Sequence, residues 1–146
     1  NGIQIFYQDT DSMHLFEKDV PRIADIFKFN YHSELIGQKM CQFHNDFEKF
    51  PGAVGQIYSR KLIALGKKSY LDILVEGYHI RLKGIPYQVI INKCKTLQIS
   101  VEELYERLYR GETITFNLLD GANGFRKSKS FQQTNLPTFT RKVKFT

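Results

Sequence analysis

The strongest constraint on the fold comes from an interrupted alternation near the start of the chain. Residues 2–7 and 12–16 alternate apolar and polar side chains, and Gln8-Asp9-Thr10-Asp11 breaks the pattern. Alternation is typical of a β-strand, and two such stretches around a short polar break predict a hairpin. The hairpin would carry Asp9 and Asp11 at its tip. Because two such close carboxylates repel each other beside apolar residues, the arrangement indicates a compensating cation.

The remaining signals predict helices mixed with further strands, an α+β fold. Asp19 followed by Pro21 predicts the start of a helix that runs to about Lys28. Ser100 and Glu103 form a capping box that opens a second helix, which Gly111 ends. The other expected elements are a helix at 86–97, two strands within 56–75 broken at Gly66-Lys67, a strand at 113–119, two strands within 125–145, turns at 51–55 and 120–124, and strand or loop at 38–50.

Composition is that of an ordinary globular protein of 146 residues, with 42% hydrophobic and 25% charged residues. No apolar run approaches the ~20 residues of a membrane-spanning helix. Cys41 and Cys94 are far apart and indicate neither a disulfide scaffold nor a zinc site. We therefore expect a reducing, intracellular compartment.

The net charge of +6 is unevenly distributed, since residues 121–146 contain no acidic side chain. Uneven basic charge favours a polyanionic partner, most often nucleic acid, although lysines can also simply keep exposed strands soluble. The basic residues of the tail are Arg126, Lys127, Lys129, Arg141, Lys142 and Lys144, and a second cluster is Arg60, Lys61, Lys67 and Lys68.

The paired aspartates suit a divalent cation, because Mg²⁺ and Mn²⁺ take oxygen ligands. Two such ions can hold a nucleoside triphosphate and activate an attacking hydroxyl. A solvated Asp-Thr-Asp turn is the alternative.

Three stretches resemble family B DNA polymerases and occur in the order found there. Tyr7 to Ser12, YQDTDS, resembles the Tyr-x-Asp-Thr-Asp-Ser box of the palm hairpin. Lys68-Ser69-Tyr70 resembles the Lys-x-Tyr box near the primer strand. Residues 36–48 look like the connector between the two boxes in protein-primed members, and a short basic thumb is similar to that branch, which serves phages, linear plasmids and viruses.

The resemblance implies a role for each matched residue. Asp9 and Asp11 would be catalytic carboxylates, with Asp11 as the metal ligand and Asp9 as its support. Lys68 and Tyr70 would hold the primer strand, and Tyr7 would pack under the tip or meet the primer terminus. Arg60, Lys61 and Lys67 would hold backbone phosphates. The basic residues of the tail would grip the duplex as a thumb strip, namely Arg126, Lys127, Lys129, Arg141, Lys142 and Lys144. The implied cofactor is Mg²⁺, as two ions in the complete enzyme, or Mn²⁺. The implied partners are a DNA primer-template, a dNTP and a priming protein.

Two boxes of the family do not occur in this sequence. One resembles Asp-x-x-Ser-Leu-Tyr-Pro and carries another metal-binding aspartate; the other carries the fingers lysine. Both precede the Tyr-x-Asp-Thr-Asp-Ser box in the family. We therefore expect a C-terminal polymerase fragment, with the end of the palm at 1–76 and a mixed α/β thumb at 77–146. The rest of the polymerase would lie upstream, and the fragment alone should not polymerise.

Two other functions remain open on the sequence. The chain could be a stand-alone nucleic-acid-binding module that keeps the basic surface and does no chemistry. It could also be a metal-dependent nuclease that uses Asp9, Asp11 and either Asp46 or Glu48. His44 and Asp46 lack a second histidine or a cysteine at useful spacing, which argues against a separate metal site there.

Overall fold

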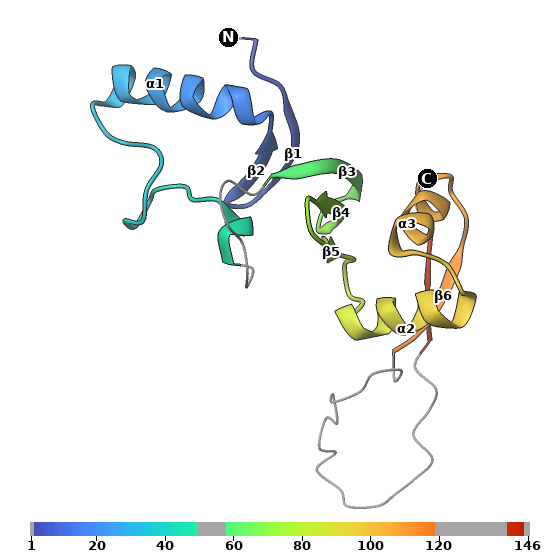
Figure 1. The fold of residues 1–146 in the computed structure, drawn as a ribbon. Coiled ribbons are helices and arrows are strands. Elements are labelled where there is room, and N and C mark those ends of the chain that lie inside the picture. The colour runs from blue at the N-terminus through green and yellow to red at the C-terminus, as the bar shows by residue number, and fades with distance from the viewer. Residues whose placement is uncertain (1, 50–57, 119–139, 145–146) are drawn as a thin grey trace, which may run out of the picture. The chain divides into compact units, whose positions relative to one another are not determined.

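The computed structural model describes residues 2–49, 58–118 and 140–144 and has the expected α+β fold (Figure 1). Antiparallel strands are combined with three α-helices. The strands are β1 (Ile5–Asp9), β2 (Ser12–Leu15), β3 (Ser59–Gly66), β4 (Ser69–Leu74), β5 (Tyr78–Arg81), β6 (Ile114–Asn117) and β7 (Thr140–Val143). The helices are α1 (Val20–Tyr31), α2 (Tyr87–Leu97) and α3 (Val101–Tyr109), with short 3₁₀ turns at Glu17–Asp19 and Asp46–Lys49.

The chain divides into two compact units. The first comprises Asn1–Arg60 and Leu74–Gly77, and the second comprises Lys61–Ile73 and Tyr78–Thr146. The expected assignment of residues 1–76 to a palm and 77–146 to a thumb stays a prediction. None of the helices in the described ranges is long and apolar enough to span a membrane.

The first unit contains the predicted hairpin. Strands β1 and β2 pair antiparallel, with Tyr7 opposite His14 and Asp9 opposite Ser12. The register shifts between Ile5 and Tyr7, as at a β-bulge. Thr10 and Asp11 form the connecting turn, so both aspartates lie at the tip as expected.

Helix α1 follows the hairpin and is longer than predicted. It begins after Asp19, whose side chain makes no capping hydrogen bond, and Pro21 lies in the first turn. The helix runs to Tyr31 and ends where His32 takes a left-handed conformation, with φ of 53°. Local sequence did not reveal this end because a left-handed residue here is not a glycine. Residues 38–49 contain no described strand beyond an isolated bridge from Ile36 to Phe43 and the 3₁₀ turn.

Strands β3, β4 and β5 form a three-stranded sheet. The predicted break falls at the two-residue turn of Lys67 and Lys68, where Lys68 has a φ of 61°. The sequence did not predict β5, which pairs antiparallel with β4. Gly77, at φ +85°, allows the tight turn that precedes β5, and the Leu74 amide donates to the Gly77 carbonyl at 3.0 Å.

Helices α2 and α3 match the expected elements closely. The Ser100 hydroxyl accepts a hydrogen bond from the Glu103 amide at 3.1 Å, which confirms the N-cap of α3. Strand β6 falls within the expected 113–119, and β7 falls within 125–145. The second strand expected there, and the turns at 51–55 and 120–124, lie outside the described residues.

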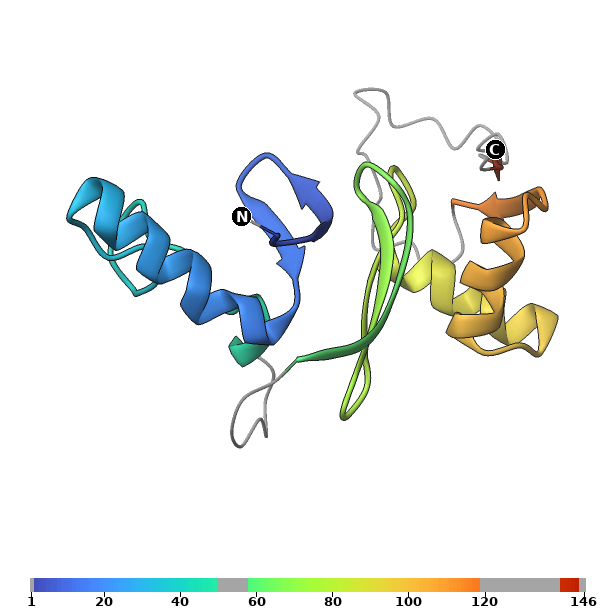
Figure 2. The same ribbon diagram turned by 90° about the horizontal axis from the view of Figure 1, so that it is seen from above.

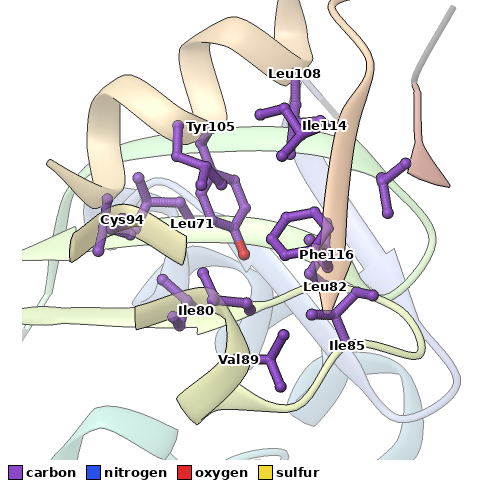
Figure 3. Close-up of a cluster of buried hydrophobic side chains, with 14 of the residues drawn as sticks. Leu71, Ile80, Leu82, Ile85, Val89, Cys94, Tyr105, Leu108, Ile114 and Phe116 are labelled. Atoms are coloured by element: carbon purple, nitrogen blue, oxygen red, sulfur yellow. The ribbon is translucent and has the colours of Figure 1, made fainter. Parts of the chain in front are cut away.

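One hydrophobic core unites the elements of the second unit. Figures 1 and 2 both show α2, α3 and β6 side by side. Leu104, Tyr105 and Leu108 of α3 are fully buried, and so is Phe116 of β6. Figure 3 shows Tyr105, Leu108 and Phe116 within this core. The core also takes Leu71 from β4 and Ile80 from β5. Burial of this apolar area is the main stabilising contribution to the unit.

Candidate functional site

The tip of the β1–β2 hairpin orders its two aspartates locally. The Asp9 carboxylate accepts hydrogen bonds from the Thr10 amide at 2.8 Å and the Thr10 hydroxyl at 3.3 Å. Thr10 therefore holds the turn, as a short polar side chain at such a position usually does. Asp9 is partly exposed as the last residue of β1, whereas Asp11 is exposed in the turn. Both carboxylates are within reach of solvent and its ions.

Tyr7 lies on the strand that leads to the tip and is buried, with 8% of its surface exposed. Its ring packs edge-on against His14 of the paired strand, with ring centroids 5.3 Å apart. The centroid of the His14 ring lies 6.5 Å from that of the Phe47 ring. These contacts correspond to the packing role expected for Tyr7. Its contact with a primer stays a prediction.

The carboxylate pair fits part of a Mg²⁺ site. Mg²⁺ prefers about six oxygen ligands and is usually held by one or two carboxylates together with water and substrate phosphates. Asp9, the last residue of β1, and Asp11, in the turn, supply two carboxylates separated by Thr10. Among the described residues, no group of three or more His, Cys, Asp or Glu side chains is placed to hold a metal ion. His44 lies 3.3 Å from Asp46, as an Nε2-to-Oδ1 contact.

The Lys-x-Tyr stretch lies where β3 turns into β4. Lys68 is exposed in the turn, and Tyr70 is half-buried on β4 opposite Arg81 of β5. The Tyr70 ring lies 5.7 Å from the His79 ring, measured between centroids. Asp72, fully buried, is the next residue on that face and pairs with His79 in the strand register.

Sequence reasoning did not single out these neighbours of Tyr70, namely Asp72, His79 and Arg81. The alternation within β4 was a usable signal, because it puts Tyr70 and Asp72 on the same face of the strand. His79 and Arg81 could not be added without knowing that β5 exists.

The basic residues that the sequence grouped together differ in their surroundings. The Lys61 ammonium contacts Glu102 at 2.5 Å and Glu106 at 3.1 Å, and these hydrogen bonds raise the pKa of Lys61 above its ordinary value. A phosphate at Lys61 would have to compete with two carboxylates of α3. Arg60 and Lys67 are exposed, as are Arg141, Lys142 and Lys144. Arg126, Lys127 and Lys129 lie outside the described residues.

Asp9, Asp11 and Tyr7 belong to the first unit, whereas Lys67, Lys68 and Tyr70 belong to the second.

Comparisons of the chain with protein-family models, with curated proteins and with solved structures found no match.

Proposed function

We propose that this chain is the C-terminal part of a family B DNA-directed DNA polymerase, comprising the end of the palm and the thumb. One observation carries the proposal. The six residues that resemble the Tyr-x-Asp-Thr-Asp-Ser box form a tight antiparallel hairpin, with Asp9 closing one strand and Asp11 in the turn. Such a hairpin is the setting that the resemblance implies for catalytic carboxylates. The short basic C-terminal part supports the protein-primed branch.

In this proposal Asp11 would hold the divalent cation, and Asp9, which accepts hydrogen bonds from Thr10, would add negative charge beside it. When bound, Mg²⁺ or Mn²⁺ supplies stabilisation of the charge that develops on the phosphates during nucleotidyl transfer. The attacking group is a primer 3′ hydroxyl or a hydroxyl of a priming protein, and the leaving group is pyrophosphate. The metal-binding aspartate of the family's Asp-x-x-Ser-Leu-Tyr-Pro box would complete the site.

Lys68 and Tyr70 would hold the primer strand in this scheme. Lys68 offers an ammonium group from an exposed turn, which suits a backbone phosphate. Tyr70 offers a half-buried ring with its position restricted by His79. Positioning of the primer matters because alignment of two bound reactants can remove about 7–11 kcal/mol of the activation barrier.

A non-catalytic nucleic-acid-binding module is the second candidate. Exposed cations on the Lys67-Lys68 turn and on β7 favour it. The two candidates differ at the hairpin tip, because a pure binding module has no need of a cation at Asp11.

A paramagnetic titration distinguishes them. Mn²⁺ broadens NMR resonances of nearby nuclei, so a site at the tip should broaden the amide signals of residues 9–12 first. Asp11→Asn should abolish this local broadening, because it removes the exposed carboxylate. Excess Mg²⁺ should restore the signals of the unaltered protein.

Asp25→Asn is the matched control, since Asp25 is an exposed carboxylate on α1. It should leave the broadening of residues 9–12 intact. Broadening spread evenly over all acidic residues, or unaffected by Asp11→Asn, would argue against the metal site and favour the binding module.

A further inference from the structure

A tight turn at residues 82–85 connects β5 to α2. The Ile85 amide donates a hydrogen bond to the Leu82 carbonyl at 2.9 Å, which puts Lys83 and Gly84 at the corners. Gly84 has a φ of +75°, as the third residue of a type II turn requires. Leu82 and Ile85 are buried in the core, whereas Lys83 is exposed. The turn is therefore anchored on both sides and presents the Lys83 side chain to solvent.

The turn lies directly beside the Lys-x-Tyr stretch. The Lys83 amide donates a hydrogen bond to the hydroxyl of Ser69, which is 1% exposed and follows Lys68. The antiparallel register pairs Tyr70 with Arg81, and Lys68 and Lys83 each lie two residues from this pair along the chain. Two lysines from different segments thus share one edge of the second unit.

Strand β7 adds an arginine to the same edge. The Arg141 guanidinium is so close to Gly84 that a Cβ built on that glycine would lie 1.7 Å from Nη1. Arg141 pairs with Phe116 of β6, and Phe116 packs in the core with Leu82 and Ile85 (Figure 3). The pairing with β6 therefore holds the backbone of Arg141 where its side chain reaches the turn.

The result is a local concentration of positive charge, the basic cluster of Lys67, Lys68, Lys83 and Arg141. The segments that carry it, residues 67–70, 82–85 and 140–144, contain no acidic side chain. Within the part of the chain that the structure describes, neither Lys83 nor Arg141 makes an ion pair. By contrast, Lys61 and Arg107 of the same unit are paired with glutamates. Like charges held together attract a polyanion.

We propose that the basic cluster binds neighbouring phosphates of a DNA backbone, and that Lys83 is a DNA contact in addition to those predicted from the sequence. The inference rests on the proposed function, which puts Lys68 beside the primer strand. It joins Lys68 of the Lys-x-Tyr box and Arg141 of the basic tail into one surface. Contacts of this kind position the duplex and carry no base specificity.

Binding of a fluorescent primer-template duplex, measured by anisotropy over a series of salt concentrations, tests the proposal. Each backbone phosphate that a protein neutralises contributes about 0.9 to the slope of log affinity against log salt. Lys83→Gln and Arg141→Gln should each weaken binding severalfold at low salt and reduce this slope by about 1. Lys95→Gln is the control, because it removes one exposed charge from the last turn of α2. It should leave both quantities nearly unchanged.

The possible results distinguish failure of the basic-cluster proposal from failure of the proposed polymerase function. If the unaltered chain binds the duplex but Lys83→Gln and Arg141→Gln behave like Lys95→Gln, the basic cluster is not the binding surface. If the unaltered chain shows no salt-dependent binding, the inference fails together with the DNA-binding part of the proposed function. Far-UV circular dichroism of each variant confirms that it is folded.

Discussion

Gly84 and Gly77 both have positive φ, but their surroundings differ. At Gly77 a Cβ would meet no atom within 4 Å, whereas at Gly84 it would meet the Arg141 guanidinium. At either position a residue other than glycine would have a higher conformational energy, because its Cβ disfavours a left-handed backbone. Of these two positions, only Gly84 is one where an added methyl group would also overlap the Arg141 guanidinium.

Substitution of each glycine by alanine separates folding from binding. Both variants should lose about 1–2 kcal/mol in the free energy of unfolding, because both force alanine to positive φ. Gly84→Ala should in addition weaken binding of the primer-template duplex, since Arg141 must move. Urea unfolding and anisotropy measure the two effects. Equal duplex affinities for Gly84→Ala and Gly77→Ala would contradict the proposal that Arg141 must lie over the turn to bind DNA.

Among the elements, α3 combines the clearest sequence signal with the deepest burial. Its N-cap and its apolar face are both local features of the sequence. The Tyr105 hydroxyl donates a hydrogen bond to the Arg81 carbonyl at 2.7 Å, which ties α3 to β5. Burial raises the pKa of Tyr105 far above its ordinary value, and burial also raises the pKa of Cys94 on α2.

These raised pKa values predict alkaline destabilisation. The unfolded chain releases the Tyr105 proton near pH 10, whereas the folded chain retains it, so the unfolded state binds fewer protons above that pH. The free energy of unfolding is therefore unaffected by Tyr105 ionisation below about pH 10. Above that pH it falls by roughly 1 kcal/mol per pH unit. The raised pKa of Cys94 also lowers the free energy of unfolding as pH rises. Its effect begins at a lower pH, because a thiol has a lower ordinary pKa than a phenol. Urea unfolding between pH 7 and 11 measures the slope.

Tyr105→Phe should make that slope shallower, while lowering stability at pH 7 by about 1 kcal/mol through the lost hydrogen bond. Tyr109→Phe is the control, because Tyr109 lies on the same helix and is 70% exposed. If Tyr105→Phe and the unaltered chain show equal slopes above pH 10, the buried phenol does not govern the alkaline transition.

At the scale of the whole molecule, the second unit buries more apolar side chains than the first. The hydrophobic core cluster lies entirely in the second unit. In the first unit α1 has no buried residue, and the hairpin contributes Tyr7. Isolated two-stranded hairpins and short helices are marginally stable by themselves. We therefore expect the second unit to account for most of the measurable unfolding free energy.

The sequence predicted those elements whose signals are local. The hairpin follows from alternation around a polar break, and α3 follows from its capping box. Strand β5 was missed because four residues beside a glycine give little pattern, and its pairing with β4 is a tertiary property. The same holds for the candidate sites. Asp9 and Asp11 could be recognised from six residues, whereas Arg141 comes close to Gly84 of the 82–85 turn only after β6 and β7 have packed against the core.

The coding sequence immediately upstream of the Asn1 codon is the first measurement that should be made on the polymerase proposal. A polymerase requires a further metal-binding carboxylate and a fingers lysine that this chain does not contain. We expect an open frame that continues upstream and encodes both, in boxes resembling Asp-x-x-Ser-Leu-Tyr and Lys-x-x-x-Asn-Ser-x-Tyr-Gly. A start codon directly before Asn1 would contradict the polymerase assignment and leave the nucleic-acid-binding module as the better account.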